Sequence, residues 1–158
     1  MFREIRRKNN VISISDAKQL LKNERRGVLA LNGDDDYPYA IPINFLFCEN
    51  ENKIFFHGSR VGYKVDCLNR NDKVCFTVYG NITIKEETWA PFVQSVVVFG
   101  KCKLIKNNDL AIKILEEFAR KYYQDEELIY KEIYTSNKAV QIFELEIEHI
   151  SGKQVQEK

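Results

Sequence analysis

The chain has 158 residues, of which 44% are hydrophobic and 30% charged, and this composition suits one globular domain spanning residues 1–158. Its charges nearly cancel to a formal net charge of +1, which excludes a global electrostatic footprint for nucleic acid or for an anionic membrane. No apolar run approaches the roughly 18 residues that span a bilayer, and no secretory leader pattern follows the first residue, so we expect a soluble, cytoplasmic protein.

The first part of the chain predicts a short helix followed by three antiparallel strands. Residues 17–22 have helical spacing behind a run of capping side chains. Strands are expected over 27–31, 37–48 and 53–57, because tight polar turns separate these apolar runs. The second strand contains Pro42, and proline cannot donate to a ladder. We therefore expect that strand to lie at a sheet edge, to bulge, or to expose its backbone to something else, such as a flat ligand.

The junction between the third strand and the next helix concentrates the polar chemistry. The strand ends in His57-Gly58-Ser59, and residues 60–70 then have helical spacing and carry Lys64. Such a junction can hold a phosphate, because the first N–H groups of a helix lack internal partners and glycine permits close approach. A plain strand-to-helix connection, with Ser59 as the N-cap and Lys64 in solvent, explains the local pattern better when that pattern is taken alone.

Two further strands follow the helix. Residues 74–79 form a nearly continuous apolar run, which is typical of a strand buried on both faces. Residues 92–106 predict a long strand with a bulge or corner at Gly100. Trp89, just before them, is expected either in the core or near the mouth of a pocket.

The last part predicts two helices and one strand. Asn108 is expected to cap a helix with an apolar stripe that runs to Tyr122, and residues 125–134 continue as a helical hairpin. Residues 143–148 alternate, which indicates a half-exposed strand whose glutamates face solvent, with a kink near Ile142 where the apolar phase changes.

The cysteines and histidines do not indicate a metal centre. The four cysteines are scattered without a C-x-x-C pair, which favours reduced thiols, and the two histidines lie far apart. The complete order of elements predicts an α+β fold dominated by antiparallel β structure, a Greek-key or split β-barrel with flanking helices.

Several motifs in this order resemble the FMN-binding split-barrel family typified by pyridoxamine phosphate oxidase, and within it the nitroimidazole-resistance-like branch. The motifs are Gly-Val-Leu-Ala at 27–30, Tyr39-x-x-Pro42-x-Asn44-Phe45, Ile54-x-Phe56-His57-Gly58-x-x-x-Gly62-x-Lys64, Val-Cys-Phe-x-Val at 74–78, and Ser95-Val-Val-Val-x-Gly100. Members of this family form homodimers that bind FMN in two equivalent clefts at the subunit interface. The resemblance covers residues 27–147.

The resemblance also implies a set of cofactor-binding residues. The isoalloxazine ring would lie along Ile41, Pro42, Ile43 and Asn44, and Ser95 would be near it. The ribityl chain and the phosphate would be lined by Phe56, His57 and Gly58. The phosphate itself would be held by Ser59 and Lys64. The oxidases carry an arginine where this chain has Tyr39, which argues against activity on vitamin B6.

The leading functional hypothesis is an FMN-dependent oxidoreductase that passes electrons from a reduced nicotinamide to a small acceptor such as a nitroaromatic. His57 is the best candidate for a catalytic side chain, although packing or contact with the ribityl chain would explain it equally. The alternative is a non-catalytic protein that stores or senses flavin or haem.

Overall fold

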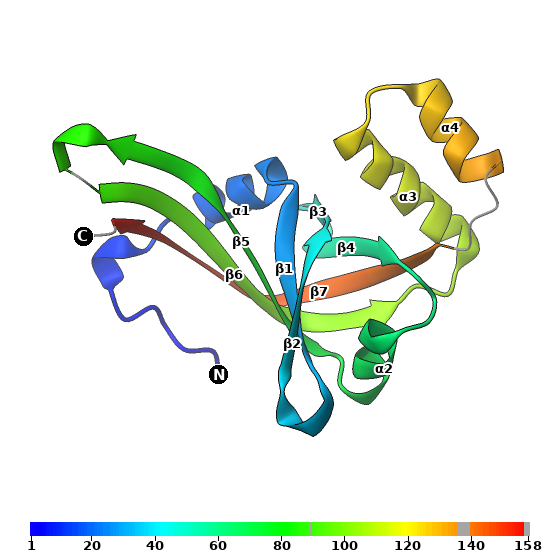
Figure 1. Ribbon diagram of the computed structural model, residues 1–158, viewed down its shortest axis with the longest axis horizontal. Coiled ribbons are helices and arrows are strands. Elements are labelled where there is room, and N and C mark those ends of the chain that lie inside the picture. Colours follow the sequence, from blue (N-terminus) through cyan, green and yellow to red (C-terminus); the bar gives the residue numbers. More distant parts are fainter. Residues whose placement is uncertain (89, 136–139, 157–158) are drawn as a thin grey trace.

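The structure is a computed structural model that describes residues 1–88, 90–135 and 140–156 (Figure 1). Trp89 lies outside these residues. The helices are α1 (Ile14–Asn23), α2 (Tyr63–Arg70), α3 (Asn108–Tyr122) and α4 (Glu126–Thr135). The strands are β1 (Arg26–Asn32), β2 (Pro38–Asn44), β3 (Leu46–Cys48), β4 (Lys53–Gly58), β5 (Lys73–Lys85), β6 (Ala90–Leu104) and β7 (Gln141–Gln156). Short 3-10 turns occupy Lys8–Asn10, Asp34–Asp36 and Glu86–Thr88.

All seven strands belong to one antiparallel sheet in the order β2-β1-β5-β6-β7-β4-β3. The sheet twists strongly, with β5, β6 and β7 as its long central strands, and it does not close through hydrogen bonds between β2 and β3 (Figure 1). This architecture confirms the predicted α+β, mainly antiparallel split barrel. No helix among the described residues is long and apolar enough to cross a membrane.

The second predicted strand is wrong in one respect, because it breaks at Phe45 into two strands. β2 pairs with β1 as far as Asn44, whereas β3 pairs with β4 at the opposite edge of the sheet. The end of α3 completes the backbone hydrogen bonds at the break. The Tyr122 hydroxyl accepts from the Phe45 N–H at 2.9 Å, and the Lys121 ammonium donates to the Phe45 carbonyl at 2.9 Å. Side chains far along the chain therefore replace the ladder that the break removes.

Two apolar clusters pack on opposite faces of the sheet. The main cluster fills the inside with residues such as Phe56, Phe76 and Phe143, and α1 and α2 add their apolar faces to it. The second cluster joins Phe55 and Ile142 to α3 on the other face. β7 runs without a register shift through Ile142, so the predicted kink is absent. The alternation of apolar residues changes at Ile142 because apolar clusters cover both faces of the strand at that point.

β5 also differs from the prediction. Its residues alternate between buried and partly exposed, so only one face enters the main cluster. The bulge predicted at Gly100 is confirmed, because the register between β6 and β7 shifts between Phe99 and Gly100. The N-cap of α3 is Asn107 rather than Asn108, since the Asn107 side chain accepts from the Leu110 N–H.

Glu144 is buried, which contradicts the predicted solvated face of glutamates. Only 5% of it is exposed. Lys53 of β4 and Lys103 of β6 flank it on both sides, at 3.3 and 3.1 Å from its carboxylate oxygens. Glu146 and Glu148 on the same face are exposed, as predicted. A buried carboxylate needs such partners, because desolvation of an unpaired charge is costly.

Candidate functional site

The edge strand β2 has side chains that point away from the core and a backbone that is unpaired along one side. Tyr39, Ile41 and Ile43 pack against the main cluster, so Pro42 and Asn44 point the other way. β2 pairs with β1 only, which confirms the edge position predicted from Pro42. The backbone groups on its free side are therefore available to another molecule.

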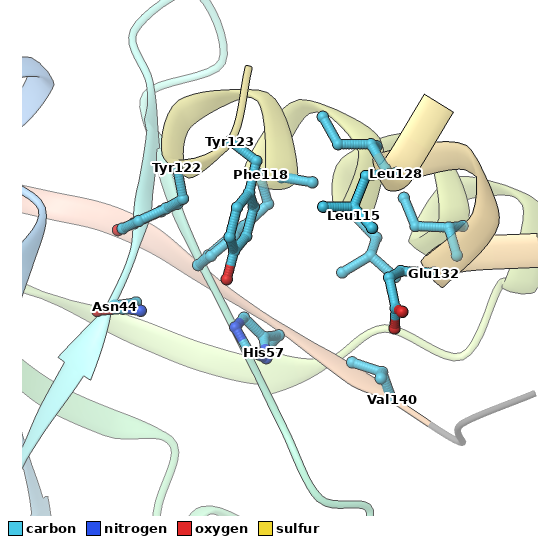
Figure 2. A pocket seen from close by; sticks show the side chains of 12 residues that line it. Asn44, His57, Leu115, Phe118, Tyr122, Tyr123, Leu128, Glu132 and Val140 are labelled. Atoms are coloured by element: carbon cyan, nitrogen blue, oxygen red, sulfur yellow. The ribbon is translucent and has the colours of Figure 1, made fainter. Parts of the chain in front are cut away.

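A cavity of about 420 Å³ lies beside the end of this strand, enclosed by α3, α4 and β4. Figure 2 shows His57 and Asn44 on one wall, with Phe118 and Tyr122 of α3 facing them. The other walls are mainly apolar and come from Leu115, Leu128, Ile129, Ile133 and Val140, with Glu132 as an acidic side chain. A pocket of this size, with apolar walls and a few convergent polar groups, is typical of a site for a small organic molecule.

The His57 side chain opens into this cavity and is held by an aromatic neighbour. Its ring meets Phe118 edge to face, with centroids 4.7 Å apart. Burial lowers the pKa of His57, and the positive charge of Lys64 lowers it further. The imidazole is therefore neutral at physiological pH, so it can donate one hydrogen bond and accept another.

The helix after β4 begins later than the sequence suggests. α2 starts at Tyr63, and its N-cap is Gly62, with no side-chain capping bond. Gly62 has a φ of 123°, a backbone conformation that L side chains rarely adopt. Ser59 is therefore not the N-cap. Its hydroxyl instead accepts from the Val61 N–H at 3.2 Å within the connecting loop.

Lys64 lies in the first turn of α2 and folds back over the end of β4. Its ammonium stands 4.3 Å from the centre of the Phe143 ring. A Cβ added at Gly58 would come within 2.6 Å of the same nitrogen, so a larger residue there would displace the lysine side chain from its present position. Burial lowers the pKa of Lys64. Within the part of the chain that the structure describes, no carboxylate lies within 4.0 Å of this ammonium.

These features bring together most of the residues predicted for the cofactor. Asn44 and His57 share the cavity, whereas the Lys64 ammonium lies beside Gly58 and over Phe143, on the other face of the sheet. Phe56 has its side chain in the core, so only its backbone can face a ligand. The uncapped start of α2, Gly58 and the unpaired Lys64 can together hold an anion.

Ser95 lies far from these residues in the same chain. It sits on β6 opposite Lys153 of β7, whereas Gly58 of β4 lies opposite Gln141 of β7. Twelve residues of one strand separate Gln141 from Lys153, which is roughly 40 Å of extended chain. One subunit therefore does not bring Ser95 into the His57 cavity.

Sequence reasoning missed the contribution of the two helices to the cavity. Phe118 and Tyr122 belong to the apolar stripe of α3, which was interpreted only as a core face. The stripe did carry a signal, because it includes a tyrosine whose hydroxyl needs a partner. That partner is the backbone at Phe45, and this contact places α3 beside His57.

The fold and the site define an α+β split barrel with an aromatic cavity beside a cationic helix start. The family model for pyridoxamine 5'-phosphate oxidase matches residues 13–154. The chain belongs to this family. No curated protein sequence matches it significantly.

Solved structures confirm the fold. A candidate 5-nitroimidazole antibiotic resistance protein from Bacteroides thetaiotaomicron aligns with a TM-score of 0.78 at 18% identity, covering 92% of this chain and 87% of its own. An FAD-binding protein from Mycobacterium smegmatis aligns with a TM-score of 0.66 at 18% identity, covering 94% and 99%. An FAD- and haem-binding protein from the same organism aligns with a TM-score of 0.69 at 17% identity, covering 92% and 72%.

Proposed function

We propose that the protein is a flavoprotein that binds FMN and passes electrons from a reduced nicotinamide to a small acceptor such as a nitroaromatic. The observation that carries this proposal is the Lys64 ammonium, which lies at Gly58 beside the start of α2 and has no carboxylate within 4.0 Å among the described residues. Membership of the oxidase family supports it, as do the neighbours whose names describe them as FAD-binding. The flavin would supply the redox chemistry, and the protein would supply binding and orientation.

The residues fit a flavin phosphate at the junction of β4 and α2. Lys64 would donate a charged hydrogen bond to the phosphate, and the free N–H groups of the first turn of α2 would add theirs. Gly58 would let the phosphate approach the backbone, and the Ser59 hydroxyl lies in the same loop. A charged hydrogen bond of this kind contributes about 1.5–3 kcal/mol to binding.

The free edge of β2 would receive the ring. Alternate residues of the segment 41–44 offer main-chain groups on the free side of a strand that pairs on one side only. The aromatic cavity beyond Asn44 would then receive the electron acceptor against Phe118. His57 would orient the acceptor, because a neutral imidazole can donate a hydrogen bond to it.

We also propose a homodimer in which each flavin site draws on both subunits. Ser95 cannot reach the His57 cavity of its own chain, so it would serve the site of a second copy. The outward face of β1, β5 and β6 carries partly exposed side chains including Val28, Cys75, Thr77 and Val97. A face of this composition fits burial against a partner. All four cysteines are free, which agrees with a reducing cytoplasm.

A second candidate function is the binding of haem or flavin for storage or sensing. Two structural neighbours favour it by their names, the FAD- and haem-binding protein of Mycobacterium smegmatis and the flavocytochrome Anf3 of Azotobacter vinelandii. His57 is a suitable axial ligand by residue type, because it faces an apolar cavity and its imidazole is neutral.

The visible spectrum of the purified protein separates these functions. We expect a flavin spectrum that bleaches with a reduced nicotinamide and recovers when a nitroaromatic is added without oxygen. A Soret band would favour haem, and a flavin that no donor reduces would favour storage. A colourless protein that binds neither added FMN nor added haem contradicts both functions.

A further inference from the structure

The N-terminal arm, defined as residues 1–12, crosses the outward face of β6 and β7. At its start Phe2 stacks on His149, with ring centroids 4.8 Å apart. At its end the Ile12 N–H donates to the Gly152 carbonyl at 3.1 Å, and Val11 forms a bridge with Lys153. Because the arm is attached at both ends, the residues between them are held over the sheet.

Two adjoining hollows of about 270 and 240 Å³ lie beneath this arm. Both are lined by Ile5 and Arg6 of the arm and by Lys153 of β7. The first also exposes the side chains of Ser95 and Ser151. The register places these groups together, since Ser95 lies opposite Lys153 and Val97 lies opposite Ser151. Alternation along both strands then turns the two serines and Lys153 toward the same face.

The charged and hydroxyl side chains that line the hollows can donate hydrogen bonds, but no acceptor among the described residues receives them. Within the described part of the chain, no carboxylate lies within 4.0 Å of Arg6 or Lys153. The acidic residue of the arm, Glu4, forms its ion pair with Lys8 instead. Arg7 adds a third unpaired cation at the second hollow. Neither serine hydroxyl makes a hydrogen bond to another described residue. This set of partners is complementary to an oxyanion.

We propose that the hollow beneath the arm is a binding site for a phosphate-bearing ligand. Arg6 would bind two phosphate oxygens through its planar guanidinium, Lys153 would add a point charge, and Ser151 would donate from the floor. The phosphate would belong to a free metabolite, because the proposed flavin site already places the single phosphate of FMN at Lys64. The site rests on residues apart from Lys64 and His57, so it stands or falls independently of the proposed oxidoreductase activity.

Calorimetric titration with inorganic pyrophosphate at low salt tests the site. The double variant Arg6→Ala with Lys153→Ala should bind pyrophosphate about tenfold more weakly or worse, because it loses two charged hydrogen bonds. The matched control is Arg3→Ala with Lys8→Ala, which also removes two positive charges but replaces no residue that lines either hollow. The control should retain most of the affinity. Ser151→Ala should weaken binding to a smaller extent.

The same titration with and without saturating FMN distinguishes the two sources of phosphate. Equal binding in both states indicates a site for a free phosphate compound. Loss of binding in the loaded protein, together with weaker FMN binding by the double variant, would show that the hollow holds part of the flavin, and it would overturn the proposal. The proposal is also overturned if the unmodified protein binds no pyrophosphate at about 10 mM. Equal weakening by both double variants would also overturn it, because nonspecific charge would then explain the binding.

Discussion

Replacing Tyr122 by phenylalanine should destabilise the break between β2 and β3. The Tyr122 hydroxyl accepts from the Phe45 N–H at 2.9 Å and lies within hydrogen-bond distance of two carbonyls, that of Phe45 at 2.8 Å and that of Arg25 at 2.5 Å. Its single proton serves one carbonyl at a time. Lys121 still donates to the Phe45 carbonyl in the variant, and the Arg25 carbonyl belongs to an exposed residue, so the buried group left without a partner is the Phe45 N–H.

The expected loss is about 2 kcal/mol, because an unsatisfied buried backbone donor costs roughly 1–3 kcal/mol. Phe45 is fully buried, so water cannot easily replace the missing hydroxyl. For a chain of this length that loss lowers the melting temperature by about 4–8 °C. The ring of the new phenylalanine can keep its stacking on Phe118, so little packing is lost. Thermal unfolding followed by circular dichroism measures the change.

Tyr123→Phe is the matched control, since it removes the same atom one position along the helix. The Tyr123 side chain is 61% exposed and makes no hydrogen bond to any described residue. Its melting temperature should stay within about 1 °C of the unmodified protein, as is usual for surface changes. If Tyr122→Phe melts at the same temperature as this control, the argument for the backbone bonds at Phe45 is refuted.

Three more changes test other parts of the structure. Lys64→Ala should weaken FMN binding about tenfold in a fluorescence titration, whereas Lys106→Ala on the exposed surface should leave it unchanged; equal affinities would show that the phosphate binds elsewhere. Glu144→Ala should lower the free energy of unfolding by about 1–3 kcal/mol in urea, because Lys53 and Lys103 lose their shared partner, and a stable variant would contradict that pairing. Burial lowers the pKa of Lys121 from 10.5 to about 8, so the unfolded state binds more protons between these values and stability should rise with pH across that window. In Lys121→Met the free energy of unfolding should no longer rise with pH across this window. An unchanged slope would contradict the lowered pKa of Lys121.

Local patterns predicted the strands and helices well but could not show where a strand changes its partner. Residues 37–48 form one apolar run with the right composition for a single strand. The break depends on Tyr122 and Lys121, which lie more than seventy residues later and complete the hydrogen bonds of Phe45. Pro42 indicates an irregular strand, but nothing in the run places the break at Phe45, because the contacts that cause it are tertiary.

The burial of Glu144 likewise could not be predicted from the local sequence. Alternation correctly assigned the glutamates to one face of β7. It could not show that Lys53 and Lys103 arrive on both flanking strands, because strand order is a property of the whole sheet. Ile142, on the same face, is buried by α3, and this cover explains why the apolar phase changes without a kink.

The candidate site also has one part that the local sequence predicted and one part that it did not. The motif around Gly58 and Lys64 predicted a strand-to-helix junction that the structure contains, because strand, loop and helix are contiguous in the sequence there. The walls of the cavity come from α3 and α4, whose sequences give only an apolar stripe. The helices reach His57 because Tyr122 is tied to Phe45, so one pair of contacts fixes both the strand break and the pocket.

The geometry of β7 links the two candidate sites of this chain. Its first residues lie beside Gly58 and its last residues lie beside Ser95, so one strand carries a half-site at each end. A ligand the size of a flavin cannot touch both ends within one subunit, since roughly 40 Å of strand separates them. The family resemblance assigns both ends to the same flavin. That assignment is geometrically consistent only if two copies pack so that the Ser95 end of one meets the Lys64 end of the other. The homodimer is therefore a requirement of the proposed flavin site and not an addition to it.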